Sequence, residues 1–112
     1  MAYGRTNDNV ITNFLDIKNM EITIKELDNK GYAMAREGDE RAGLMTYSVA
    51  GDNHIIIDHT EVDPKFKGKN IGKQLLYKIV EMAREKDIKI TPLCPFAAAM
   101  FKKLEDIQDV LK

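Results

Sequence analysis

Three short stretches of this sequence carry side chains that can do chemistry. Residues 58–62 read DHTEV, residues 66–76 read FKGKNIGKQLL, and residues 91–96 read TPLCPF. The first contains a histidine and a carboxylate, which suit proton transfer. The second contains glycines and lysines, which suit a phosphate group, and the third contains the one cysteine of the chain. A shared site requires a fold that brings the three stretches together.

The stretch of lysines and glycines favours an anion site. Four lysines surround the expected start of a helix: Lys65, Lys67, Lys69 and Lys73. Cations oppose the helix dipole at that end, and a bound anion would remove the mismatch. Free backbone N–H groups, a glycine turn and nearby ammonium groups together suit a phosphate. The alternative is a solvated lysine run in which the glycines only shape the turn.

Two well-known phosphate loops do not match this stretch. Gly68 and Gly72 enclose three residues, whereas a Walker A loop has four between its glycines. The Rossmann pattern G-x-G-x-x-G is also absent from the sequence.

Alternating and helical patterns predict the elements that hold the three stretches. Four strands separated by turn-forming residues are expected at 20–27, 32–37, 42–50 and 54–62. A long helix from Lys69 to Lys86 has an apolar stripe, a strand follows at Ile88 to Thr91, and a last helix begins near Pro95. Phe96, Met100, Phe101 and Leu104 are expected to face the core, which Ile107, Val110 and Leu111 close.

The order strand, helix, strand places the three stretches at one edge. A helix between two strands implies a parallel pair with a right-handed crossover. The carboxyl ends of such strands lie at the same edge, where ligands collect in sheets of this type. Glu61, Gly68 and Cys94 are therefore expected to converge there. The alternative for residues 58–61 is a strand that simply emerges into water.

Composition indicates one domain and argues against nucleic acid, a membrane or a metal ion as a partner. The chain has 112 residues, 44% of them hydrophobic and 31% charged, and a formal net charge of −1. Such a chain gives no overall field toward nucleic acid or an anionic membrane. It has no apolar run long enough for a membrane span, and the lone cysteine suits a reducing compartment, so a cytoplasmic protein is expected. Two histidines and one cysteine do not form a recognisable metal-ligand set, so no metal is expected.

The residues EVDPKFKGKNIGKQLL resemble the acyl-coenzyme A binding segment of the Gcn5-related N-acetyltransferases, the GNAT superfamily. Its signature is [Q/R]-x-x-G-x-[G/A], and here Lys67, Asn70 and Gly72 occupy the three defined positions. Lys67 keeps a positive charge, and Asn tolerates a left-handed backbone better than most residues. DHTEV before the turn and PLCPF after it are similar to the small, single-domain, minimal branch of the superfamily.

The resemblance runs from Met20 to Lys112 and implies a fold and a cosubstrate. The implied fold is an α/β domain of the α+β type, with a mixed, mostly antiparallel twisted sheet of about five strands, a central crossover helix and a C-terminal helix. Residues 1–19 form an N-terminal extension. The helical spacing of Val10, Ile11, Phe14 and Leu15 predicts a short helix within it. The implied activity is transfer of an acetyl group from acetyl-CoA to an unidentified amine acceptor, with an acceptor side that is open.

By the same resemblance, Val62 meets the pantetheine arm and the turn holds the pyrophosphate through Lys67, Gly68, Lys69, Asn70, Ile71, Gly72 and Lys73. Cys94 is a candidate nucleophile, which accepts the acetyl group as a thioester or only lines the acyl pocket. Glu61 is a candidate general base, provided that burial or a neighbour raises its pKa toward neutrality, with His59 as its partner on the same face.

Ordinary structural roles compete with each of these assignments. A lone cysteine is most often a buried hydrophobe, and Glu61 and His59 can be solvated residues at a strand end. A coenzyme A binding module without catalysis, and an interaction domain that binds no nucleotide, are the competing functions.

Overall fold

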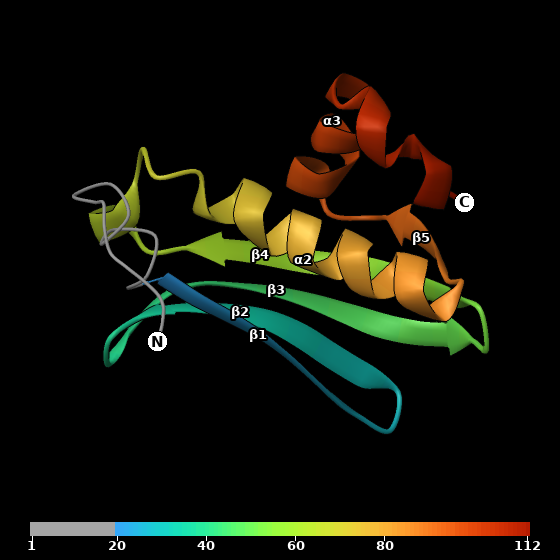
Figure 1. Cartoon of the computed structure of the whole chain (residues 1–112), viewed down its shortest axis with the longest axis horizontal. Coiled ribbons are helices and arrows are strands. Elements are labelled where there is room, and N and C mark those ends of the chain that lie inside the picture. The colour runs from blue at the N-terminus through green and yellow to red at the C-terminus, as the bar shows by residue number, and fades with distance from the viewer. Residues whose placement is uncertain (1–19) are drawn as a thin grey trace, which may run out of the picture.

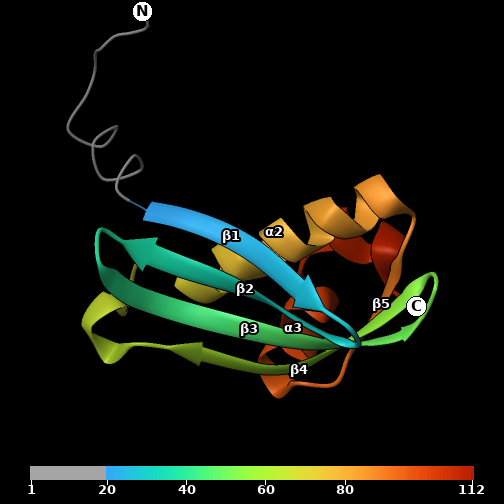
Figure 2. The same cartoon turned by 90° about the horizontal axis from the view of Figure 1, so that it is seen from below.

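A five-stranded sheet, with its strands in chain order, is the platform of the fold (Figures 1 and 2). The computed structural model describes residues 20–112, so the helix predicted in the N-terminal extension lies outside the described residues. The first four strands are antiparallel neighbours, and the fifth pairs with β4 in parallel. Their bounds are β1 Met20–Leu27, β2 Lys30–Glu37, β3 Glu40–Gly51, β4 His54–Val62 and β5 Lys89–Pro92.

Two helices lie on the same side of this sheet (Figure 1). Helix α2, Ile71–Lys86, connects β4 to β5, and helix α3, Pro95–Lys103, follows β5. The apolar stripe of α2 is buried as its periodicity predicts, with Leu75, Leu76, Ile79 and Val80 all fully inaccessible. They pack on inward-facing strand residues such as Met45, Tyr47, Ile55 and Ile57. In Figure 2 the opposite side of the sheet carries no helix among the described residues.

Small residues on the sheet let α2 approach closely at its first turn. Ala33, Ala35 and Ala42 are fully buried beneath the helix side. At Gly43 a Cβ atom would lie 2.8 Å from Ile71 Cγ2 and 2.9 Å from the carbonyl oxygen of Glu61. Gly43 therefore fixes how near the start of α2 comes to the end of β4.

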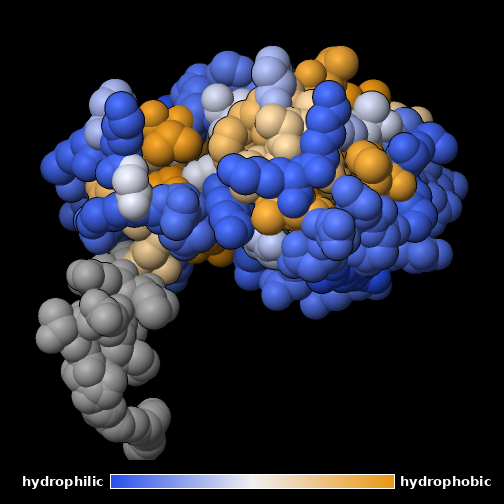
Figure 3. Space-filling model, turned by 90° about the horizontal axis from the view of Figure 1, so that it is seen from above, coloured by the Kyte–Doolittle hydropathy of each residue, from blue (hydrophilic) through white to orange (hydrophobic). Residues whose placement is uncertain are grey.

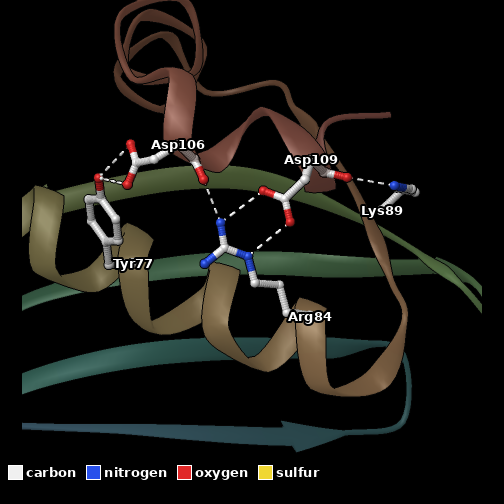
Figure 4. A network of polar contacts seen from close by, with 5 residues as sticks. All are labelled: Tyr77, Arg84, Lys89, Asp106 and Asp109. Atoms are coloured by element: carbon white, nitrogen blue, oxygen red, sulfur yellow. Dashed lines mark hydrogen bonds and ion pairs between the residues drawn. The ribbon is translucent and has the colours of Figure 1, made fainter.

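The C-terminal segment is fastened to α2 by a network of polar contacts (Figure 4). The short 3-10 helix Glu105–Val110 buries Ile107 and Val110. Arg84 of α2 donates through Nε and Nη2 to the two carboxylate oxygens of Asp109, at 2.9 and 2.8 Å. The hydroxyl of Tyr77 donates to Asp106 at 2.7 Å, which raises the pKa of Tyr77.

The ion pair of Arg84 with Asp109 predicts a pH-dependent contribution to stability. The hydrogen bond from Arg84 lowers the pKa of Asp109 below its ordinary value of 3.8. The contribution of the ion pair to stability is thus fully present when the pH is above the ordinary pKa of an aspartate. It is lost as the pH falls through the lowered pKa of Asp109. Arg84→Ala is expected to lower the melting temperature by a few degrees at neutral pH, and the difference from wild type should shrink below about pH 4.

Thermal unfolding followed by circular dichroism across this pH range measures the effect. Lys78→Ala is the matched control, because Lys78 is on the same helix and its one ion pair within residues 20–112 is with the exposed Glu81, at 3.4 Å. A gap between Arg84→Ala and wild type that stays constant down to pH 2 would show that the ion pair is not its cause.

The elements predicted within residues 20–112 are confirmed, with small shifts at their ends. Helix α2 begins at Ile71 rather than at Lys69, because Asn70 has left-handed backbone angles. Strand β5 includes Pro92, which still pairs with Ile57 of β4. The expectation that Phe96 and Leu111 lie in the core is wrong, since each side chain is 38% exposed.

Candidate active site

The sheet opens between β4 and β5 at the carboxyl end of both strands. Their pairing ends at Ile57 and Pro92. The N–H groups of Leu93 and Cys94 then both donate to the carbonyl of Ile57, at 3.0 and 3.1 Å, and the chain turns away into α3. Strand β4 continues to Val62 with β3 as its only strand neighbour in the described sheet. One backbone edge of β4 is therefore free beyond Ile57.

The turn before α2 has the geometry of an anion cradle. Asn70 adopts φ 58° and ψ 36°, the left-handed conformation expected of it, and its side chain makes no capping hydrogen bond. Gly68 has φ 89°, which favours glycine. The first turn of α2 contains no acidic residue. The first backbone N–H groups of a helix have no partner within the helix, so they are available to a ligand here.

The lysines around this turn are not equivalent. Lys65 donates a hydrogen bond to Glu40, and this bond raises the pKa of Lys65. Lys69 Nζ lies 3.8 Å from Glu37 Oε2. Lys67 and Lys73 have no ion pair with any residue between 20 and 112. Lys73 Nζ lies 6.0 Å from the ring centre of Tyr77. Lys67 and Lys73 are thus the two cations of the cluster that have no acidic partner in the part of the chain that the structure describes.

A groove of about 250 Å³ separates the turn from α3. Its walls are Asn70, Gly72 and Lys73 on one side and Phe96, Met100, Lys103 and Leu104 on the other. Phe96 lies over Gly72 so closely that a Cβ atom on the glycine would be 2.6 Å from Phe96 Cζ. The sequence reasoning did not assign Lys103 or Leu104 to a site. The sequence signal that could have identified Lys103 was its spacing from Phe96 and Met100. Residues at i, i+4 and i+7 lie on one face of a helix.

Hydrophobic side chains of the three stretches are exposed to solvent. Five large hydrophobic residues are well exposed among residues 20–112: Leu27, Val62, Leu93, Phe96 and Leu111. Three of them, Val62, Leu93 and Phe96, belong to the stretches that form the site. Figure 3 views the helix-covered side of the molecule, where hydrophobic patches interrupt a mostly hydrophilic surface. An apolar arm of a ligand would find contacts at this end.

Cys94 lies between the two strands at the start of α3. It is 4% exposed and is the N-cap residue of the helix, where its Sγ accepts a hydrogen bond from the N–H of Ala97 at 3.5 Å. The hydroxyl oxygen of Thr60 on β4 lies 3.2 Å from the same sulfur atom. Thr60 was not among the sequence candidates. Two polar groups from separate elements therefore hold the thiol at the end of the free β4 edge.

The two other catalytic candidates face away from Cys94. His59 Nε2 lies 3.2 Å from Glu61 Oε2, so the two residues share a face as predicted. Their side chains are 63% and 54% exposed, and Arg41 lies 3.7 Å from Glu61. Neighbouring strand residues point to opposite faces, so Thr60 points toward Cys94 while His59 and Glu61 point to the other side. Of the two conditions for Glu61 as a general base, burial is not met.

A bulge in β4 causes this division. Tyr47 pairs with Ile57 and Thr46 pairs with His59, which leaves Asp58 as an extra residue. Strict alternation from the buried Ile57 would have put His59 and Glu61 on the helix side of the sheet. The bulge reverses the faces and puts Thr60 there instead.

No group of three or more His, Cys, Asp or Glu residues within 20–112 is arranged to hold a metal ion. In the same part of the chain, none of the helices has the length and apolarity to cross a membrane.

Comparison with solved structures finds the same fold. A GCN5-like candidate N-acetyltransferase from Staphylococcus aureus, solved by NMR, is 39% identical over 84% of this chain and 89% of its own, with a TM-score of 0.63. The ribosomal-protein-S18-alanine N-acetyltransferase of Escherichia coli is 14% identical over 71% of this chain and 54% of its own, with a TM-score of 0.60. At these identities the second likeness concerns the fold alone.

A third structure of this fold was solved with a ligand. It is a candidate streptothricin acetyltransferase from Bacillus anthracis in complex with acetyl coenzyme A, 17% identical over 76% of this chain and 68% of its own, with a TM-score of 0.53. The search of curated proteins gave no match.

A family comparison covers most of the described residues. The family described as GCN5-related N-acetyl-transferase matches residues 31–110. Together with the Staphylococcus aureus relative, this match confirms both the predicted resemblance and the predicted fold class. The chain belongs to the GCN5-related N-acetyltransferase family.

Proposed function

We propose that the protein binds acetyl-CoA at the edge formed by the three stretches and transfers its acetyl group to an amine. The observation that carries the proposal is the convergence of the free β4 edge, the turn before α2 and the Cys94 thiol at one opening. Family membership supports an acetyl-CoA-dependent N-acetyltransferase. We also propose residues 20–112 as the acetyl-CoA-binding domain and residues 1–19 as an extension of it.

The backbone of the turn is proposed to hold the pyrophosphate. The N–H groups of Ile71, Gly72 and Lys73 begin α2, and Lys67 and Lys73 are free of acidic partners within the described residues. Gly68, Lys69 and Asn70 complete the turn. Val62, at the end of the free β4 edge, meets the pantetheine arm, and Phe96 and Met100 form an apolar wall beside it.

Cys94 is proposed to carry the acetyl group between cosubstrate and acceptor. Acetyl-CoA supplies an acetyl group activated as a thioester. The Cys94 sulfur forms a bond to the acetyl carbonyl carbon, the bond from that carbon to the coenzyme sulfur breaks, and the coenzyme leaves as its thiol with the Cys94 proton. The acceptor nitrogen then forms a bond to the same carbonyl carbon, the bond from that carbon to the Cys94 sulfur breaks, and the proton lost by the nitrogen restores the Cys94 thiol.

Glu61 and His59 are proposed to serve the acceptor side. Their exposed pair lies on the face of β4 opposite Cys94, beside Arg41. From that face they are proposed to orient the acceptor as it enters. Direct attack of the amine on acetyl-CoA is the alternative route through the same site.

Release of coenzyme A thiol in the presence of a panel of amines tests the proposed function. The panel contains amino acids, polyamines and peptides with a free N-terminus or a lysine. At least one amine should raise the rate of thiol release at least tenfold above hydrolysis and appear as its N-acetyl product by mass spectrometry. Binding of acetyl-CoA with no acetylated product from any amine would favour the module without catalysis.

A cytoplasmic location belongs to the same proposal. The free, buried Cys94 suits a reducing compartment, and acetyl-CoA is the proposed cosubstrate.

A further inference from the structure

Lys103 lies in the last turn of α3 and lines the groove on the wall that faces the phosphate turn. The groove also contains Lys73 on the opposite wall, and its lining includes two lysines but no carboxylate. Neither α2 nor α3 has an acidic residue in its first turn. The positive charge of this groove is therefore not balanced by its own lining.

Lys103 also lacks an acidic partner within residues 20–112. It differs in this from Lys65 and Lys69, which are held by Glu40 and Glu37. An ammonium group free to move at the rim of a groove suits a phosphate, because it can approach the ligand without first breaking an ion pair.

A cation at this position also has an ordinary explanation. Lys102 and Lys103 both lie in the last turn of α3, where the helix dipole favours positive charge. That explanation applies equally to the two residues. Only Lys103 lines the groove, so the pair offers a matched comparison within one helix turn.

We infer that Lys103 binds a phosphate group of coenzyme A, so that the phosphate site has a second wall on α3 in addition to the turn before α2. This inference rests on the proposed function, since it names a further residue for the same cosubstrate. The spacing of α3 supports it: Phe96 covers Gly72, and Lys103 follows two turns later on the same helix face. Lys103 thus lines the same groove as the turn that is proposed to hold the pyrophosphate.

Calorimetric titration of coenzyme A into Lys103→Gln and Lys102→Gln tests the inference. Lys103→Gln should weaken binding roughly two- to fivefold, the upper part of the range for one partly exposed charge contact. Lys102→Gln should change it less than twofold. Equal melting temperatures of the two variants would confirm that loss of helix stability is not the cause.

Pantetheine and dephospho-coenzyme A make the readout specific. Pantetheine has no phosphate, so Lys103→Gln should bind it as wild type does. A loss seen with coenzyme A but not with dephospho-coenzyme A assigns Lys103 to the 3′-phosphate, and an equal loss with both assigns it to the pyrophosphate. The inference is overturned if the two lysine variants bind coenzyme A equally, or if Lys103→Gln weakens pantetheine as much as coenzyme A. Failure of the wild-type protein to bind coenzyme A would instead overturn the proposed function itself.

Discussion

Gly72→Glu is expected to abolish coenzyme A binding in a calorimetric titration, with a loss of more than about a hundredfold. Two effects act together at this buried position. A Cβ atom would lie 2.6 Å from Phe96 Cζ, so the side chain must displace the ring that forms the opposite wall. A carboxylate about 5 Å from a phosphate also costs roughly 3 kcal/mol at an effective dielectric constant of about 20.

Gln74→Glu is the matched control for this variant. It adds the same charge to the first turn of α2, but Gln74 is exposed and does not line the groove. The variant also loses the exposed hydrogen bond from Gln74 Nε2 to the carbonyl oxygen of Lys69, which is 2.9 Å long. Its effect should stay below about fivefold, because an exposed charge is screened by water and salt. Gly72→Ala separates size from charge, since it disturbs Phe96 and adds no charge. Coenzyme A affinity in Gly72→Glu equal to that in Gln74→Glu would contradict the placement of the phosphate at the turn.

Cys94→Ala is expected to prevent covalent acetylation and to reduce amine acetylation by roughly a hundredfold or more, the scale seen when a catalytic group is removed. The intact mass of wild type, recorded after brief mixing with acetyl-CoA and no amine, should show the gain of one acetyl group. Cys94→Ala should show none and should still bind coenzyme A, because Cys94 lies at the end of β5 and not in the turn.

Thr60 gives a control for the environment of the thiol. Its hydroxyl lies 3.2 Å from Cys94 Sγ, so Thr60→Val should slow the acetyl gain severalfold, and Thr60→Ser should restore it by keeping the hydroxyl. Rapid turnover by Cys94→Ala would contradict the thioester route and would leave direct attack by the amine as the mechanism.

Repeating patterns in the sequence predicted most of the fold. Runs of strand-forming residues between turn-forming residues predicted β1 to β4. The apolar stripe from Ile71 to Met82 predicted α2, because such a stripe buries one face of a helix. The turn was also predictable, since Asn70 is among the few residues that adopt the left-handed conformation it shows.

The arrangement of side chains in the site was less predictable. The bulge at Asp58 reverses the faces of β4, and no residue type in that strand predicts a bulge there. Thr60 therefore replaces Glu61 as the neighbour of Cys94. Phe96 was expected in the core because it is aromatic and lies on the helix face shared by Met100. The Phe96 ring instead lies against Gly72 at the groove. This contact joins distant parts of the chain, and periodicity does not predict it.

A titration of acetyl-CoA into the isotopically labelled protein, followed through its backbone amide NMR signals, tests the central claim most directly. The account predicts saturable shifts that are largest for the amides of residues 70–73, at the turn before α2, with further shifts at residues 58–62 and 94–97. The hairpin between β1 and β2, at the opposite end of the sheet, should be unaffected. The absence of shifts at millimolar acetyl-CoA, or shifts confined to that hairpin, would contradict the claim that the turn, the free β4 edge and Cys94 form one acetyl-CoA site.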